Sequence, residues 1–383
     1  MGSASGKAPT YGHPFLRTRS AAKECTFPPE EVQSCLLPDR DSSLTSLPAF
    51  QRMLEQNEAG GGMQTTRSMT FPRAMLITMR PYLLFLSGIT GAAGLAAAPE
   101  ASIAIVLPVF LASFFSYGFG QALTDCFQTD TDALSAPYRP LVRGTVRKSS
   151  VLMASLVGLT LCSLAFALGN SVNLILGLVA VCGLATYTWF KRRWWGGPWY
   201  NAWIVVLLSV MAYLAGSGGT IASLPASLIP LILVVFFGYA NFVLAGYFKD
   251  IAADRQTGYL TFPVVFGRKA ASFVSDALAA GATVALVVLL SHTWPESHSW
   301  QELLGSAAFM VLGGVHMVVA QVLLHRNSED KDAHRPIRNV VQGYVLYLSA
   351  AAASMQPSWT LPLVAFYVGF LLVLRHRTER SQI

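Results

Sequence analysis

Charged residues are scarce in this sequence: Asp, Glu, Lys and Arg make up 12% of its 383 residues, against roughly a quarter in an ordinary soluble domain. This deficit, together with 53% hydrophobic residues, argues against a soluble enzyme and against a disordered chain. The five cysteines form no CxxC pair, which argues against a metal or disulfide framework. No apolar stretch stands near the start, so we expect no secretory signal peptide.

The first 69 residues differ from the rest of the chain. They are polar and rich in Gly, Ser, Thr and Pro, and they contain no apolar run long enough to span a membrane. Their basic residues are typical of a transit peptide, but the acidic residues among them argue against one. We therefore predict a flexible polar cytosolic tail over residues 1–69, with a targeting segment as the alternative.

Long apolar runs begin at about residue 70. They lie near 74–97, 102–121, 150–168, 172–190, 200–217, 227–246, 270–291 and 304–325, with two shorter runs near 340–355 and 359–374. A bilayer core of ~30 Å needs about 20 apolar residues of helix, and the eight longer runs meet or approach that length. The two short runs predict one broken helix or two tilted ones. The fold class expected is all-α, a polytopic membrane bundle of nine or ten transmembrane helices over residues 70–376.

The basic residues alternate along the chain. Four loops hold them, at 122–148, 191–198, 247–269 and 326–338, while the loops between carry no Lys or Arg. Because basic loops stay on the cytoplasmic side, this pattern predicts a cytosolic N-terminus and explains the net charge of +7 without a nucleic-acid partner. Residues 377–383 form a basic tail, which favours an even number of spans. The compartment expected is an endomembrane, and no protein partner is predicted.

The first basic loop contains a group of carboxylates. It reads TDCFQTDTD at 124–132, followed by APYRPLVRG at 136–144. If the preceding helix continues, Asp125, Gln128 and Asp132 recur at i, i+3 and i+7 and share one face. Asp130 then points elsewhere.

The third basic loop repeats this chemistry in the segment YFKDIAADRQTGY at 247–259. Asp250 and Asp254 are spaced i, i+4, and Tyr247 precedes them by one turn. Carboxylates suit Mg²⁺, which commonly bridges one or two of them to substrate phosphates. Phosphate donors are expected from neighbouring basic residues, namely Arg139, Arg143, Lys191, Arg192 and Lys249. The pattern predicts a diphosphate held by Mg²⁺ at a membrane surface, and the alternative is a set of simply solvated charged loops.

These two motifs resemble those of the UbiA superfamily of intramembrane prenyltransferases. The family's N-D-x-x-D-x-x-x-D motif and YRP-type loop match TDCFQTDTDALSAPYRPLVRG, and its second motif matches YFKDIAADRQTGYLTFPVVFG. The basic loop between the motifs is matched by YTWFKRR at 187–193. The likeness covers residues 70–376 and implies a bundle of about nine helices. Two positions depart from the family motif: Thr124 replaces its Asn, and Gln128 replaces its second Asp.

The resemblance implies a mechanism in which Mg²⁺ assists the ionisation of an allylic diphosphate. Asp125, Asp132, Asp250 and Asp254 are the expected catalytic carboxylates, acting as metal ligands together with Gln128. The diphosphate is expected to contact Arg139, Lys191, Arg192, Lys249 and Tyr247. The prenyl group would pass from a polyprenyl diphosphate to an aromatic or lipid-like hydrophobic acceptor within the lipid bilayer. Two alternatives stay open: a UbiA-type terpene cyclase acting on a C15 or C20 diphosphate, and a transporter or lipid-binding scaffold.

Aromatic, ionisable and small residues inside the apolar runs lead to three further predictions. The allylic cation needs aromatic faces, and six residues are candidates to provide them: Phe114, Phe115, Tyr117, Phe119, Trp189 and Tyr239. Asp276 and His316 are ionisable groups within neighbouring runs, and their similar depth predicts that they pair. The small-residue run GITGAAGLAAA at 88–98 predicts close helix packing.

Overall fold

The structure is a computed structural model and describes residues 69–98, 101–294 and 300–376. Every regular element within these ranges is a helix, which confirms the all-α prediction. The predicted flexible tail lies outside the described residues except for Met69, and the predicted basic tail, residues 377–383, lies wholly outside them. The helices are α2 (Phe71–Met79), η1 (Pro81–Leu83), α3 (Leu84–Ala96), α4 (Ile103–Asp125), α5 (Thr129–Ser135), α6 (Lys148–Ala167), α7 (Asn173–Arg193), α8 (Gly197–Ser217), η2 (Ile221–Ser223), α9 (Leu228–Tyr247), α10 (Ile251–Gln256), α11 (Phe262–Thr293), α12 (Trp300–His325), η4 (Asp330–Ala333), α13 (His334–Met355), η5 (Pro357–Trp359) and α14 (Thr360–Arg375).

Eight of the described helices are long and apolar enough to cross a membrane. They are α4, α6, α7, α8, α9, α11, α12 and the continuous segment of η5 and α14. Helix α2 and the segment Pro81–Ala96 meet the same requirement together, but they are bent by 47° at Arg80 and make a ninth span only if counted as one. The chain is a multi-pass integral membrane protein with eight to nine candidate spans in the described part, which agrees with the lower of the two predicted numbers.

The last two apolar runs form two separate helices. Helix α13 has 22 residues and α14 has 16, with η5 between them. Helix α13 falls short of the hydropathy of a span because its first half contains polar residues such as Arg338, Asn339 and Gln342. It lies inside the bundle nevertheless, since residues 339–354 are all buried.

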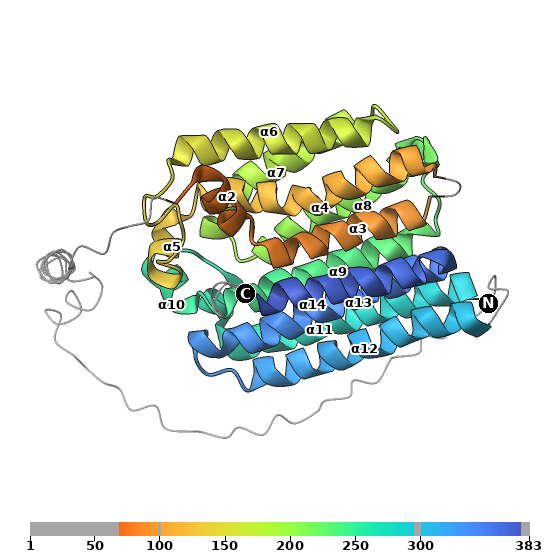
Figure 1. The fold of residues 1–383 in the computed structure, drawn as a ribbon. Coiled ribbons are helices and arrows are strands. Elements are labelled where there is room, and N and C mark those ends of the chain that lie inside the picture. Colours follow the sequence, from red (N-terminus) through yellow and green to blue (C-terminus); the bar gives the residue numbers. More distant parts are fainter. Residues whose placement is uncertain (1–68, 99–100, 295–299, 377–383) are drawn as a thin grey trace, which may run out of the picture. The chain divides into compact units, whose positions relative to one another are not determined.

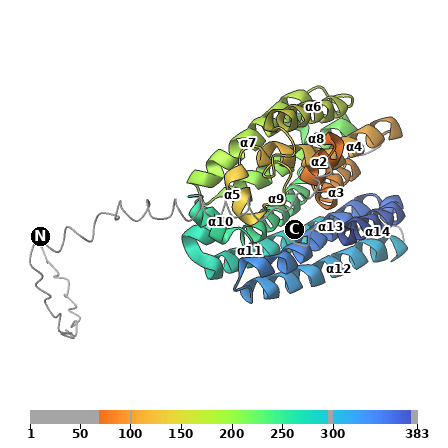
Figure 2. The same ribbon diagram turned by 60° about the vertical axis from the view of Figure 1, so that its left-hand side comes forward.

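The long helices run beside one another, and α9 and α13 lie among the others (Figures 1 and 2). Helix α9 packs against α8, α11 and α13, and most of its residues are buried. In the outer helices α6, α7, α12 and α14 most residues are at least partly exposed, and many of these are large and apolar. An apolar outer face is what a lipid environment requires, because it offers no partner for polar groups.

Small residues allow the helices to approach closely at the centre. All 13 residues of α3 are buried, which agrees with the close packing predicted from the run at 88–98. A Cβ atom added at Gly94 would lie 2.2 Å from the carbonyl oxygen of Ser209 on α8. Glycine is therefore required there by backbone contact between α3 and α8.

Two short helices, α5 and α10, lie at the same end of the long helices (Figure 1). They interrupt the chain between α4 and α6 and between α9 and α11. The Oγ1 atoms of Thr131 and Thr257 lie 2.9 Å apart and join the two short helices. Both carboxylate motifs are thereby brought to one end of the bundle, which we call the basic end because the basic loops lie there.

The predicted pairing of Asp276 with His316 is wrong. The carboxylate of Asp276 lies 2.7 Å from Nε2 of His325, and Nδ1 of His316 lies 2.9 Å from Oδ1 of Asn339. The prediction compared the depths of Asp276 and His316 from the ends of their apolar runs. The helices have other bounds than the runs, since α11 begins at Phe262 and α12 extends from Trp300 to His325, and the partner of Asp276 is therefore a different histidine. Each group therefore has one polar partner on a neighbouring helix, while Oδ1 of Asp276 is buried without a hydrogen-bond partner.

Candidate functional site

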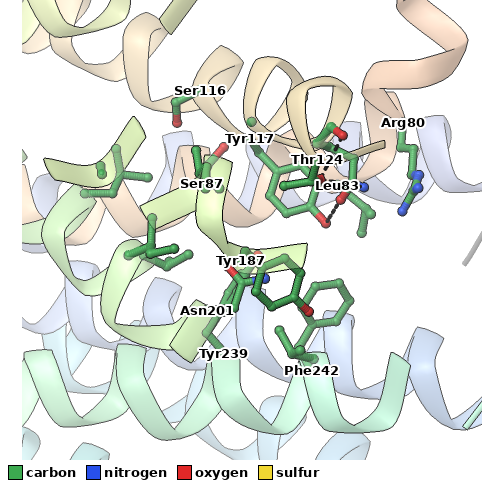
Figure 3. Close-up of a pocket in the computed structure, with 18 of the residues that line it drawn as sticks. Arg80, Leu83, Ser87, Ser116, Tyr117, Thr124, Tyr187, Asn201, Tyr239 and Phe242 are labelled. Carbon is green, nitrogen blue, oxygen red and sulfur yellow. Dashed lines mark hydrogen bonds between the residues drawn. The ribbon is translucent and has the colours of Figure 1, made fainter. Parts of the chain in front are cut away.

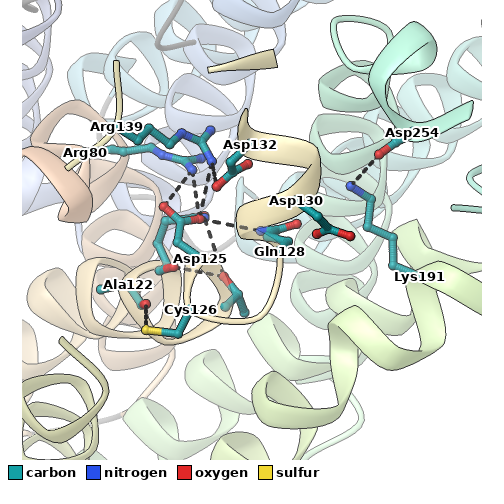
Figure 4. A network of polar contacts seen from close by, with 12 residues as sticks. Arg80, Ala122, Asp125, Cys126, Gln128, Asp130, Asp132, Arg139, Lys191 and Asp254 are labelled. Atoms are coloured by element: carbon teal, nitrogen blue, oxygen red, sulfur yellow. Dashed lines mark hydrogen bonds and ion pairs between the residues drawn. The ribbon is translucent and has the colours of Figure 1, made fainter. Parts of the chain in front are cut away.

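The first motif does not continue the helix of the preceding span, in contrast to the continuous helix used to predict which residues share a face. Helix α4 ends at Asp125, and Gln128 has φ −129° and ψ 31° before α5 begins. The turn still keeps the predicted residues together, because the side-chain amide of Gln128 donates to Oδ1 of Asp125 over 3.5 Å. Asp132 follows in α5 and is also buried. The convergence predicted from helical spacing is thus produced by a broken helix (Figure 4).

Two arginines neutralise these carboxylates. Nη2 of Arg80 donates to both oxygens of Asp125, at 3.0 and 3.1 Å. Nη1 of Arg139 forms an ion pair with Asp132 and lies 3.7 Å from Oδ1 of Asp125. Since Arg139 and the two carboxylates that it joins are nearly buried, each charge depends on the others.

Gln121 orients the carboxylate of Asp125 from one turn earlier on α4. Its Nε2 donates to Oδ1 of Asp125 over 2.6 Å. Thr124, which replaces the family Asn, donates its hydroxyl to the backbone oxygen of Gln121 over 2.9 Å. The hydroxyl of Thr124 also accepts from Nε2 of Gln121 over 3.5 Å, and Thr124 itself lines the pocket described below, while the hydrogen bond to Asp125 comes from Gln121.

The second motif holds its two carboxylates differently. Asp254 is fully buried, and its oxygens accept from Nζ of Lys191 over 3.2 Å and from Oγ1 of Thr261 over 3.1 Å. Oδ1 of Asp250 is also shielded from solvent, but it has no hydrogen-bond partner. An unpartnered buried carboxylate oxygen is costly, and it is the group in this site best suited to receive a cation.

A pocket opens between the two motifs and runs into the bundle. Its empty space is about 1510 Å³, counting the solvent at its opening. Asp132, Gln128, Arg139, Lys249 and Asp250 line its polar part. Its other part is mostly apolar and is lined by residues of α6, α7, α8 and α9, among them Phe166, Val181, Leu208, Met211 and Phe242.

Tyrosines lie where the polar and apolar parts of the pocket meet. The hydroxyls of Tyr187 and Tyr247 are 2.7 Å apart, and Nζ of Lys191 lies 5.1 Å from the centre of the Tyr247 ring. Tyr117 and Tyr239 present their rings to the same space (Figure 3). A cation in this region would meet several aromatic faces.

Burial shifts the pKa values of the loop residues. It raises the pKa of Asp254 to about 6, although the ammonium of Lys191 opposes the shift. It also raises the pKa of Asp132, again against an opposing arginine, Arg139. It lowers the pKa of Lys249 to about 8. Charged groups are held out of water on both sides of the pocket, which favours binding of a ligand that brings compensating charge.

Seven of the predicted site residues line the pocket: Gln128, Asp132, Arg139, Lys191, Tyr247, Lys249 and Asp250. Three do not. Asp125 lies behind Arg80 and Arg139 in a small adjoining cavity, and Asp254 is enclosed by Lys191 and Thr261. Arg192 is not among the residues that line the pocket, and it pairs with Asp130 at 2.5 Å.

Of the six predicted aromatic residues, Tyr117 and Tyr239 line the pocket. Phe115 and Trp189 are exposed on the outer surface, and Phe114 packs against Phe85 with ring centroids 5.1 Å apart. An apolar surface and an apolar pocket have the same composition in a membrane protein, so the sequence does not separate them.

Sequence reasoning missed four polar residues of the site. They are Arg80, Gln121, Tyr187 and Asn201, all of which line the pocket. Arg80 has a left-handed backbone, with φ 53°, at the bend that precedes Pro81. An arginine directly before a proline within the first apolar run is the signal that would have found it.

The donor set is compatible with Mg²⁺. No group of three or more His, Cys, Asp or Glu side chains within residues 69–98, 101–294 and 300–376 can hold a metal ion alone. Mg²⁺ does not require such a cage, since it keeps waters and commonly bridges one or two carboxylates to phosphate oxygens. Asp132 and the unpartnered oxygen of Asp250 provide that kind of partial site.

Comparison with known proteins agrees with the fold and the motifs. The model of the UbiA prenyltransferase family matches residues 84–341. The digeranylgeranylglyceryl phosphate synthase of Thermococcus kodakarensis is 27% identical over 278 residues, which cover 69% of this chain and 91% of that protein. The bacteriochlorophyll synthase 34 kDa chain of Chloroflexus aurantiacus is 27% identical over 194 residues, covering 49% and 61% of the two chains.

Solved structures are similar in fold. A UbiA homologue from Aeropyrum pernix K1 has a TM-score of 0.59 at 18% identity and covers 70% of this chain and 96% of that one. A UbiA homologue from Archaeoglobus fulgidus, bound to DMAPP and Mg²⁺, has a TM-score of 0.52 at 18% identity, covering 71% and 98%. The family model, the relatives and the helical fold lead to one conclusion: the chain belongs to the UbiA prenyltransferase family.

Proposed function

We propose that the chain is a Mg²⁺-dependent intramembrane prenyltransferase that ionises a polyprenyl diphosphate and transfers the prenyl group to a hydrophobic, aromatic or lipid-like acceptor. One observation carries the proposal: Asp132, Asp250 and the basic residues line the same pocket that continues into an apolar channel. A diphosphate matches the first part and a prenyl chain matches the second.

The charged part of the pocket would hold the leaving group. Asp132, Asp250 and Gln128 would bind Mg²⁺, which supplies Lewis-acid stabilisation of the diphosphate. Arg139 and Lys249 would donate to the phosphate oxygens, and the charge that develops on the leaving group is neutralised by donors already in position. Lys191 stands between this region and Asp254, so it would contact the diphosphate while holding the second motif together.

The apolar part would hold the prenyl chain. Lys191 and Gly177 both line the pocket from α7, and their separation of 14 residues corresponds to about 21 Å of helix. Buried residues such as Phe166 and Met211 keep water from this part. Exclusion of water protects an allylic cation from hydrolysis.

Bond breaking and bond making would follow from this arrangement. The allylic C–O bond breaks with both electrons going to the diphosphate oxygen, and a carbon cation remains. The rings of Tyr117, Tyr239 and Phe242 line the pocket and would stabilise this cation through their faces. The acceptor donates an electron pair to form the new bond and then loses a proton.

The names of the relatives and neighbours support this assignment. A digeranylgeranylglyceryl phosphate synthase supports a lipid-like acceptor, and a structure with GPP and Mg²⁺ at 17% identity and a TM-score of 0.52 supports a prenyl diphosphate with the metal. The alternation of basic loops supports a cytosolic N-terminus and a diphosphate site on the cytosolic side. An endomembrane is the proposed compartment.

A product assay tests the proposal. Membranes containing the protein would be incubated with Mg²⁺ and labelled C10, C15 or C20 prenyl diphosphate, first alone and then with a panel of aromatic and lipid acceptors. We expect a prenylated product only with an acceptor, and none with Asp250→Asn. A cyclic hydrocarbon or terpene alcohol formed without an acceptor would contradict prenyl transfer and indicate a terpene cyclase. The changed motif residues Thr124 and Gln128 are the reason to test for this product.

A further inference from the structure

A cluster of side chains joins the two carboxylate loops outside the pocket. Oδ2 of Asp130 lies 2.5 Å from Nη2 of Arg192, and Oδ1 of Asp130 accepts from the hydroxyl of Tyr259 over 3.3 Å. The guanidinium carbon of Arg192 lies 4.4 Å from the centre of the Tyr259 ring. We call Asp130, Arg192 and Tyr259 the loop clamp.

The clamp joins three separate stretches of chain. Asp130 belongs to α5, Arg192 to the last turn of α7, and Tyr259 to the segment between α10 and α11. The backbone N–H of Leu260 also donates to the carbonyl oxygen of Arg192 over 3.3 Å. The clamp thus connects α5 with the second motif in addition to the direct contact between Thr131 and Thr257.

Each member of the clamp stands next to a site residue. Asp130 is two residues from both Gln128 and Asp132, and Arg192 directly follows Lys191. Nζ of Lys191 lies 4.9 Å from the centre of the Tyr259 ring, which is fully buried. The clamp therefore lies directly beside residues on both sides of the pocket.

Asp130 itself does not enter the site. It is not among the residues that line the pocket, and its side chain is 39% exposed. Figure 4 shows it turned away from Asp125 and toward the side of Lys191. Its two oxygens are engaged by Arg192 and Tyr259, so its contacts are with the other loops.

We propose that Asp130 is a positioning residue, which through Arg192 and Tyr259 holds the first carboxylate loop against the second and so fixes the spacing of the diphosphate site. The inference rests on the proposed function for its substrate. It also reassigns Arg192, which the sequence predicted to bind the diphosphate directly.

The test compares Asp130→Asn and Asp130→Ala with the unchanged protein and with Asp130→Glu. Removing the charge is expected to raise both the KM for prenyl diphosphate and the Mg²⁺ concentration for half-maximal activity by about fivefold, the upper range for an exposed ion pair. kcat should change less than about twofold, since no group that touches substrate is altered. Asp130→Glu should recover most of the affinity, and exchanging the charges in Asp130→Arg with Arg192→Asp should recover part of it.

Hydrogen exchange gives a readout that does not depend on activity. In the full-length protein in detergent, without substrate, Asp130→Ala should speed amide exchange in segments 126–135 and 257–261 while leaving α9 and α13 unchanged. Lys331→Gln is the matched control, because it breaks an exposed ion pair with Glu329 at 2.6 Å. It should alter neither the exchange of these segments nor KM.

The outcomes separate the clamp from the proposed function. Unchanged exchange and unchanged KM in Asp130→Ala overturn the clamp, whatever the enzyme does. A loss of kcat that Asp130→Glu does not restore also overturns it, because Asp130 would then act on the substrate or metal. If the unchanged protein shows no Mg²⁺-dependent reaction, the proposed function fails, and the exchange measurement alone decides the clamp.

Discussion

The ion pair between Lys191 and Asp254 gives the sharpest stability prediction. Its Nζ–Oδ1 distance is 3.2 Å, and the two side chains are 5% and 0% exposed. Replacing Lys191 by Met would leave Asp254 buried with Thr261 as its remaining partner. Removing one partner of a buried pair costs about 3–5 kcal/mol, and we expect Lys191→Met to lose about 3 kcal/mol because the Thr261 hydrogen bond stays.

The loss should depend on pH in a defined direction. Burial already raises the pKa of Asp254 to about 6, and removal of the neighbouring ammonium raises it further. A carboxyl whose pKa is raised in the folded state binds a proton that the unfolded chain has released, so stability falls as the pH rises toward that folded-state pKa. The deficit of Lys191→Met should therefore grow between pH 6 and pH 8, by at most about 1.4 kcal/mol per pH unit.

Thermal unfolding in detergent micelles measures this effect. A loss of about 3 kcal/mol corresponds to a fall in melting temperature of roughly 6–12 °C. Lys331→Met is the control, because that lysine is 76% exposed and its loss should be nearly neutral. Adding Asp254→Asn to Lys191→Met should recover part of the stability, since it removes the unpaired charge. The reasoning is refuted if Lys191→Met behaves like Lys331→Met, or if the two changes simply add.

Three further predictions concern the site and the bundle. Arg139→Gln should raise the KM for prenyl diphosphate by at least about tenfold, because it removes a charged donor and leaves the carboxylate of Asp132 without its ion-pair partner. Initial rates measured over a range of prenyl diphosphate concentrations give this KM. Gln128→Asp should lower the Mg²⁺ concentration for half-maximal activity, since it adds a carboxylate to the pocket, and an unchanged Mg²⁺ curve would remove Gln128 from the metal site. Gly94→Ala should destabilise the chain by about 1–3 kcal/mol, because its Cβ would meet Ser209 at 2.2 Å, whereas Gly246→Ala, with nothing within 4 Å, should unfold at nearly the same temperature as the unchanged protein.

The sequence was informative where chemistry is local. Helical spacing grouped Asp250 with Asp254 and Asp125 with Asp132, and in each group both residues lie at or directly behind the pocket. The assumption of a continuous helix through residues 125–132 was wrong, because Gln128 has a non-helical backbone between α4 and α5. The grouping survived because the turn that replaces the helix keeps the side chains near one another.

The sequence was less informative where contacts are distant. Arg80 lies 45 residues from Asp125, and only the bend before Pro81 brings the two together. The partner of Asp276 was misassigned because α11 begins at Phe262, before its apolar run, and its Asp276 meets His325 at the last residue of α12 instead of His316. Spacing along one helix is fixed by its geometry, whereas contacts between helices depend on their ends and register, which apolar runs do not define.

The release of diphosphate tests the central claim most directly. The protein in membranes would be given labelled C15 or C20 prenyl diphosphate and an acceptor panel, with and without Mg²⁺, and the same measurement would be made on Asp250→Asn. The account predicts release and a prenylated product that require both Mg²⁺ and Asp250. Release that continues in Asp250→Asn, or without Mg²⁺, would contradict it.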